Sequence, residues 1–65
     1  MEWISVKDDL PLFNTDVLVH DERGHIFVAY RKNFYGIWHW VDSYGFDTVD
    51  EILYWMPLPE PPNEE

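Results

Sequence analysis

Apolar and polar residues alternate along several short stretches of the chain, with the two-residue period of a β-strand. In residues 16–20, Val17 and Val19 point to one side of an extended chain and the residues between them point to the other. Residues 25–31 and 37–41 are further runs of strand length, with large apolar side chains on both faces of the extended chain. No segment long enough for a crossover helix separates these stretches, so we expect three short strands in an antiparallel meander. The expected connections between them are residues 21–24 and 32–36.

The two ends of the chain are expected to complete the fold. Residues 52–56 form a further apolar stretch that stops at Pro57, and this pattern predicts a fourth strand. The predicted strands carry large apolar groups on both faces, so one face of the sheet needs a cover. We expect the N-terminal segment and a polyproline-like strap at residues 59–62 to cover it. The predicted fold class is therefore mainly β, or a small α+β at most, with three to four short strands.

The length of the chain, 65 residues, is enough for one small domain with one core. We expect this domain to span residues 1–59, followed by an acidic, proline-containing tail at 60–65. The sequence has no cysteine, so no disulfide supports the fold. Four Trp, four Tyr and four Phe could supply about half of the apolar area that the fold has to bury, and they predict an aromatic core.

The sequence carries 13 Asp and Glu against four Lys and Arg, which gives a formal net charge of −9. A charge of this sign opposes direct binding to nucleic acid phosphates and to anionic lipid surfaces. No stretch approaches the roughly 20 apolar residues that span a bilayer, and no cationic, hydrophobic leader opens the chain. We therefore expect a cytoplasmic protein that neither enters a membrane nor binds nucleic acid directly.

Two segments near the ends of the chain resemble the signatures of a known family. The first has Trp-Ile-Ser-Val-Lys-Asp at residues 3–8, followed by Leu10 and Pro11, and the second has Tyr-Trp-Met-Pro-Leu-Pro-Glu-Pro-Pro at residues 54–62. Both are similar to segments of a family of small domains of unknown function that occurs in phages, prophages and bacteria. The resemblance implies a phage or mobile-element context in a bacterial host cell. It implies no catalytic residues.

Residues with catalytic or metal-binding chemistry are dispersed along the sequence. His20, His25 and His39 have no cysteine partners and no spacing typical of zinc ligands, so we expect them to be structural or solvent-exposed. The acids of residues 42–51 lack the ligand arrangement of an EF-hand loop. We therefore predict no catalytic residue, no metal site and no cofactor, and we do not expect an enzyme.

Aromatic residues in the predicted connections are the main candidates for a binding surface. Large aromatic side chains are enriched at interface hot spots, and loops place them where a partner can reach them. Acidic residues accompany them in the last connection, where we also expect Asp47 to cap a single helical turn. The candidate protein-binding surface comprises Phe34, Tyr35, Tyr44, Phe46, Asp42, Asp47, Asp50 and Glu51.

The leading hypothesis from the sequence is a non-catalytic protein–protein interaction module that acts on a protein partner. An alternative is an acidic inhibitor whose carboxylates mimic phosphates and occupy the basic groove of a nucleic-acid-binding host defence protein. A further alternative is a self-assembling structural module, with a homodimer as its simplest form. Salt separates the first two hypotheses, because binding by phosphate mimicry weakens steeply with ionic strength and binding by an aromatic surface does not.

Overall fold

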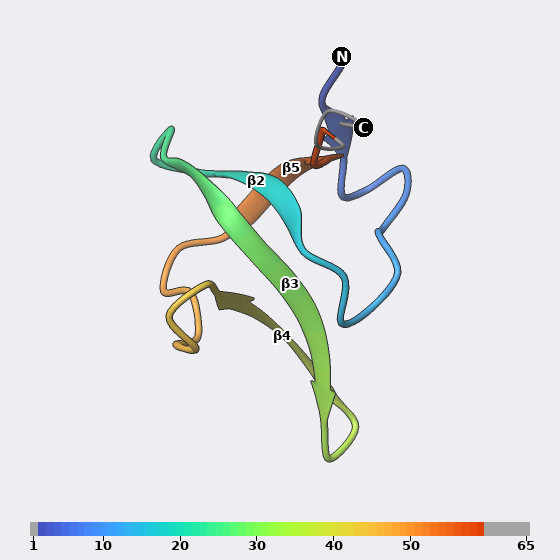
Figure 1. The fold of residues 1–65 in the computed structure, drawn as a ribbon, viewed down its shortest axis with the longest axis vertical. Coiled ribbons are helices and arrows are strands. Elements are labelled where there is room, and N and C mark those ends of the chain that lie inside the picture. Colours follow the sequence, from blue (N-terminus) through green and yellow to red (C-terminus); the bar gives the residue numbers. More distant parts are fainter. Residues whose placement is uncertain (1, 60–65) are drawn as a thin grey trace, which may run out of the picture.

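The computed structural model describes residues 2–59, which form one open sheet of antiparallel strands (Figure 1). The strand order across the sheet is β1-β5-β2-β3-β4. This arrangement confirms the prediction of a β fold and contains the expected meander, β2-β3-β4. The strands are β1 (Ile4–Ser5), β2 (Val17–Asp21), β3 (Ile26–Phe34), β4 (Ile37–Asp42) and β5 (Ile52–Pro57).

The strand predicted near the C-terminus is present as β5, and it adds to the sheet beside β2. Val19 of β2 lies opposite Trp55 of β5, and Trp55 in turn lies opposite Ile4 of β1. The chain therefore leaves β4 at one edge of the sheet and returns to pair on the far side of β2 (Figure 1). This return brings the first and last strands of the chain side by side.

The hairpin formed by β3 and β4 is longer than the sequence predicts. The expected connection at residues 32–36 shrinks to Tyr35 and Gly36, because β3 continues to Phe34 and pairs with the start of β4. Figure 1 shows the tip of this hairpin projecting away from the other strands. The molecule is correspondingly elongated, with principal extents of 42 × 23 × 21 Å.

The core lies on one face of the sheet, at the end where β2, β3 and β5 are paired. The N-terminal segment between β1 and β2 crosses this face, as expected for a cover. Its contacts include the indole N–H of Trp55, which donates to the backbone oxygen of Asp9 at 2.9 Å, and Phe13, whose ring centroid lies 6.0 Å from that of Trp38. The buried core residues are Val17, Val19, Ala29, Ile52 and Trp55, with Ile4, Val6, Phe27 and Trp40 packed against them.

The prediction of an aromatic core is wrong for the described part of the chain. Trp55 is the one aromatic residue among the buried residues of 2–59, and the others are mostly small or aliphatic. The physical reason is that a single small sheet with one short covering segment has room for few large rings between its layers. Most aromatic side chains therefore lie at the edges of the sheet, on the hairpin and in the loops.

Residues 43–51 connect β4 to β5 without any helix, so the predicted helical turn at Asp47 is wrong. Asp47 instead forms an isolated antiparallel bridge with Val41, because the loop folds back along the outer edge of β4. Within residues 2–59 no helix exists that is long and apolar enough to cross a membrane. Pro57 ends β5 as predicted, whereas the acidic tail at 60–65 and most of the predicted proline strap lie outside the described residues.

Candidate functional site

The tip of the β3–β4 hairpin is a two-residue turn made by Tyr35 and Gly36. Both residues have positive φ, 55° and 85°, as a type I′ turn requires. The N–H of Gly36 donates to Oδ1 of Asn33 at 3.0 Å, which holds the turn. Glycine adopts this conformation easily, but a large side chain at the first position of the turn is uncommon, where Asn, Asp and Gly are preferred. Tyr35 therefore has a backbone conformation that is unfavourable for a residue with a large side chain.

The side chains around this turn are apolar and exposed. Tyr35 is 90% exposed, and Phe34 and Ile37, which flank the turn, are also largely exposed. The rings of Phe34 and Tyr35 contact each other edge to face, with centroids 4.5 Å apart. Trp38 follows one residue later and is 47% exposed. Trp38 points to the face opposite that of Phe34 and Ile37, so exposed apolar side chains occur on both faces near the tip, as is common at interaction sites.

The same hairpin is the cationic part of an otherwise acidic chain. Residues 24–41 contain no Asp or Glu, and they include Arg31 and Lys32. The guanidinium carbon of Arg31 lies 4.2 Å from the centroid of Trp38, and Lys32 Nζ lies 5.6 Å from the centroid of Phe34. Both cations thus lie over aromatic faces, an arrangement that stabilises the charge and orders the rings. We call residues 30–40, with these aromatic and cationic side chains, the arm.

The loop after the arm is organised by Asp42. Its Oδ1 accepts the backbone N–H groups of Tyr44 at 2.9 Å and Phe46 at 3.0 Å, so one carboxylate oxygen holds a tight turn through Gly45. Tyr44 and Phe46 are both exposed beside this turn. The loop is tied back to the arm by His39, whose Nδ1 lies 3.4 Å from Oδ2 of Asp47.

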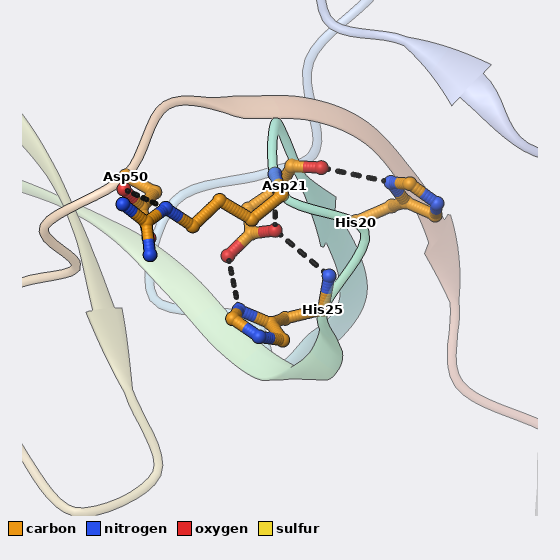
Figure 2. A network of polar contacts seen from close by, with 5 residues as sticks. His20, Asp21, His25 and Asp50 are labelled. Carbon is orange, nitrogen blue, oxygen red and sulfur yellow. Dashed lines mark hydrogen bonds and ion pairs between the residues drawn. The ribbon is translucent and has the colours of Figure 1, made fainter.

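The turn between β2 and β3 is built around a buried carboxylate, Asp21, which is 3% exposed. Its Oδ1 accepts the backbone N–H groups of Arg23 and His25, at 2.9 and 2.8 Å, while Oδ2 lies 3.2 Å from Nδ1 of His25. Figure 2 shows both contacts between Asp21 and His25. Burial by itself raises the pKa of Asp21, but the hydrogen bonds from His25 and Arg23 hold the pKa below its ordinary value. The carboxylate is therefore ionised near neutral pH and serves as the hydrogen-bond acceptor for the backbone N–H groups of the turn.

Asp21, His25 and Asp50 also bring three potential metal ligands within 4.8 Å of one another. Their other contacts fit a hydrogen-bonded turn better than a cation site. Both oxygens of Asp21 already accept or face a donor, and Nε of Arg23 lies 3.5 Å from Oδ1 of Asp50, where its positive charge opposes a metal ion. We therefore assign these residues a structural role.

An open cleft of about 570 Å³ separates the β2–β3 turn from the β4–β5 loop. Four acids line it together with Tyr44 and Val49, but each acid has a partner. Asp21 and Asp42 accept backbone N–H groups, while the other two contact cationic or titratable side chains. The cleft is acidic because its walls are built from carboxylate-capped turns. The four acids are Asp21, Asp42, Asp47 and Asp50.

Comparison with known proteins places the chain in a family. Residues 2–63 match the family described as Protein of unknown function (DUF551). The chain belongs to this family. No curated protein and no solved structure matches it.

The structure divides the sequence-predicted surface of this DUF551 domain into two groups. Phe34 and Tyr35 lie at the tip of the arm, and the other six residues lie in or beside the loop at the opposite end of β4. Five residue steps of the β3–β4 ladder separate the two ends, which corresponds to roughly 17 Å. The predicted residues are exposed apart from Asp42 and Asp50, which are half-buried.

Sequence reasoning missed two members of the exposed group, Ile37 and Trp38. Both lie in the predicted strand at 37–41, but β4 is the edge of the sheet, so Ile37 stays 62% exposed and Trp38 47% exposed. The available signal was the Asn33-Phe34-Tyr35-Gly36 sequence, in which Gly36 and a nearby Asn indicate a short turn. A two-residue turn there places Ile37 at the tip rather than within a strand interior.

Proposed function

We propose that this chain is a non-catalytic protein-binding module that acts in the cytoplasm of bacteria carrying phages or prophages, and that it binds through the tip of the arm. The observation that carries the proposal is Tyr35. Its side chain is 90% exposed and its φ of 55° is one that Asn or Gly adopts at lower cost. A residue that costs conformational energy and makes few contacts within its own chain supports a role in binding.

The neighbours of Tyr35 support the same conclusion. Phe34, Ile37 and Trp38 expose further apolar surface at the tip, and Arg31 and Lys32 place positive charge behind it. Aromatic and Arg side chains are the residue types that dominate protein interface hot spots. The non-catalytic part of the proposal is supported by the polar clusters, whose hydrogen bonds are used within their own turns.

The test begins with a photocrosslinking amino acid placed at position 35 of the full chain in bacterial cells. A matched control carries it at Leu12, which is exposed on the N-terminal segment. We expect a covalent adduct with a defined protein from position 35 and none from position 12. Equal yields at both positions, or no adduct at either, contradict binding through the tip.

The substitution Tyr35→Asn then tests whether the aromatic side chain carries the affinity. Asn-Gly is the preferred type I′ sequence, so the hairpin should keep or gain stability while the ring is lost. The partner identified by crosslinking is then purified without a crosslink. We expect the affinity of the Tyr35→Asn variant for this partner to be about tenfold or more lower than that of the wild type, as for a hot-spot residue. Isothermal titration calorimetry measures the affinity, and thermal unfolding checks the fold. Unchanged affinity in a folded Tyr35→Asn variant contradicts the proposal.

A second candidate function, phosphate mimicry, is favoured by one observation, the four acids that line the cleft. Against it, each of those acids already has a hydrogen-bond or ion-pair partner in the chain. The same calorimetry separates the two candidates. Affinity that falls steeply between about 50 and 500 mM salt and is unchanged in Tyr35→Asn favours mimicry, because screening weakens exposed charge pairs and leaves apolar contacts intact.

A further inference from the structure

The outer edge of β4 is only partly covered by the chain itself. Phe34 and Ile37 flank the two-residue turn, so every second residue of β4, beginning with Ile37, directs its backbone groups at β3. The alternate residues, Trp38 and Trp40, direct theirs away from the sheet. At the end of β4 distant from the turn, the following loop provides hydrogen-bond partners for this edge, since the N–H of Thr48 donates to the backbone oxygen of Trp40 at 3.0 Å.

The near part of the edge, beside the tip, is open. Within residues 2–59 no hydrogen bond uses the backbone N–H or C=O of Trp38. Edge strands are usually protected by Pro, by Lys, by a bulge or by extreme shortness. β4 has six residues, Ile-Trp-His-Trp-Val-Asp, none of them Pro or Lys, and its ladder with β3 is regular. An unprotected apolar edge of this kind is a template for pairing with another strand.

The charges along this edge are arranged in a self-complementary way. The arm carries Arg31 and Lys32 and no acid, whereas residues 42–51 at the other end of β4 carry four acids and no base. If two copies of β4 lie antiparallel, the cationic arm of each copy faces the acidic loop of the other. A two-fold arrangement satisfies both contacts at once, because the same surface is used by both copies.

We infer that the open edge of β4 pairs antiparallel with the same edge of a second copy, around Ile37 and Trp38, and that the tip of each arm lies on residues 47–49 of the other copy. Val49 is 96% exposed in that segment, so its apolar side chain is available to contact the Tyr35 ring of the other copy. The inference rests on the proposed function, because it names the partner of the same arm. It also explains why exposed residues occur at both ends of β4.

A second copy fits this edge better than an extended peptide does. The open stretch ends where Thr48 bonds to Trp40, so an added strand forms only a few backbone hydrogen bonds. Affinity must therefore come from side chains beyond the strand, and the aromatic tip and the loop of a second copy supply them. The contact area is small compared with the roughly 1,200 to 2,000 Å² of stable complexes, so we expect a dimer with a Kd on the order of 10–100 µM.

The test is sedimentation equilibrium of the chemically synthesised full chain, over a concentration range from about 10 µM to about 1 mM that brackets this Kd. The wild-type mass should rise from 7.9 kDa toward twice that value. A methyl group on the backbone nitrogen of Trp38 removes the outward donor without touching the ladder to β3. We expect this variant to dimerise at least about tenfold more weakly, the loss that corresponds to about 1.4 kcal/mol.

Matched controls separate edge pairing from loss of fold. The same backbone methyl group at Leu12, which lies in the N-terminal segment, should leave dimerisation unchanged. The substitution Val49→Lys adds a cation opposite the arm at a fully exposed position, so it should weaken the dimer while the thermal unfolding temperature stays constant. Leu12→Lys is its charge-matched control.

A chain whose mass stays at 7.9 kDa up to the highest concentration overturns the inference, as does a dimer that survives both the Trp38 and the Val49 changes. These outcomes leave the proposed function intact if position 35 still crosslinks to a different protein. A monomer that also gives no crosslink at position 35 overturns both.

Discussion

The β2–β3 turn and the β3–β4 turn of this sheet differ in what their side chains do. At the first, the carboxylate of Asp21 is buried and accepts two backbone N–H groups of the same turn. At the second, Asn33 makes one exposed hydrogen bond and Tyr35 projects into solvent from a disfavoured backbone conformation. One turn is stabilised by its own polar contacts, and the other displays apolar surface.

This difference indicates which part of the molecule supports the fold and which part is available for binding. The buried core and the Asp21 turn lie at the same end of the sheet, so changes there should affect stability first. The arm projects beyond that core and contributes exposed side chains. Changes there should affect stability little and binding strongly. Three predictions test this contrast, beginning with the largest expected effect.

Replacing Asp21 with Ala should destabilise the protein more than any change at the arm tip. The substitution leaves the N–H groups of Arg23 and His25 without their acceptor in a buried turn. We expect the thermal unfolding temperature to fall by about 10 °C, measured by circular dichroism. The control Asp21→Asn keeps an acceptor oxygen and should lose less. A fall of 2 °C or less on this scale for Asp21→Ala would show that the turn does not depend on the carboxylate.

The stability of the β2–β3 turn should also depend on pH in the acid range. The pKa of Asp21 lies below its ordinary value in the folded chain, so its ionised form contributes stability above about pH 4. That contribution is lost as the pH falls through the folded pKa. Unfolding temperatures between about pH 5 and pH 2 should therefore fall more steeply for the wild type than for Asp21→Asn. Parallel curves would mean that other carboxylates account for the acid sensitivity.

At the arm, replacing Asn33 with Ala should have the smallest effect of the three. It removes the hydrogen bond to the N–H of Gly36, which is exposed and can bond to water instead. We expect a loss of about 0.5 kcal/mol in the free energy of unfolding by urea. Amide exchange should show faster opening near the tip and unchanged protection in β2 and β5. A loss as large as that of Asp21→Ala would remove the contrast between the two turns.

The sequence predicted the strands of this fold more accurately than the connections between them. Residues 16–20, 25–31 and 37–41 each contain most of one observed strand, because side-chain alternation is a local property of an extended chain. The connection at 32–36 was predicted too long, since Lys32, Asn33 and Phe34 are polar or aromatic residues that strands and loops both accept. Their partners in β4, His39, Trp38 and Ile37, decided the outcome.

The candidate binding surface stays a prediction, and the structure shows only how exposed its residues are and where they lie. Aromatic residues in connections proved to be exposed, and Tyr35, Tyr44 and Phe46 are the clearest cases. The sequence did not indicate that they lie at two ends of one strand, or that Trp38 belongs with them. Exposure of Trp38 depends on β4 being the last strand of the sheet, and strand order is set by contacts between segments far apart in the chain.

By itself, the sequence determined the class of the fold, the approximate strands and the sites of the turns, because these follow from alternation and from residues such as Gly24 and Gly36 that accept positive φ. The tertiary structure alone decided that β5 pairs with β2, that Asp21 is buried and that residues 2–59 leave the edge of β4 open beside the tip. Pairings such as Val19 with Trp55 join residues more than half the chain apart. Their free energy depends on how whole surfaces pack, and no local pattern encodes that.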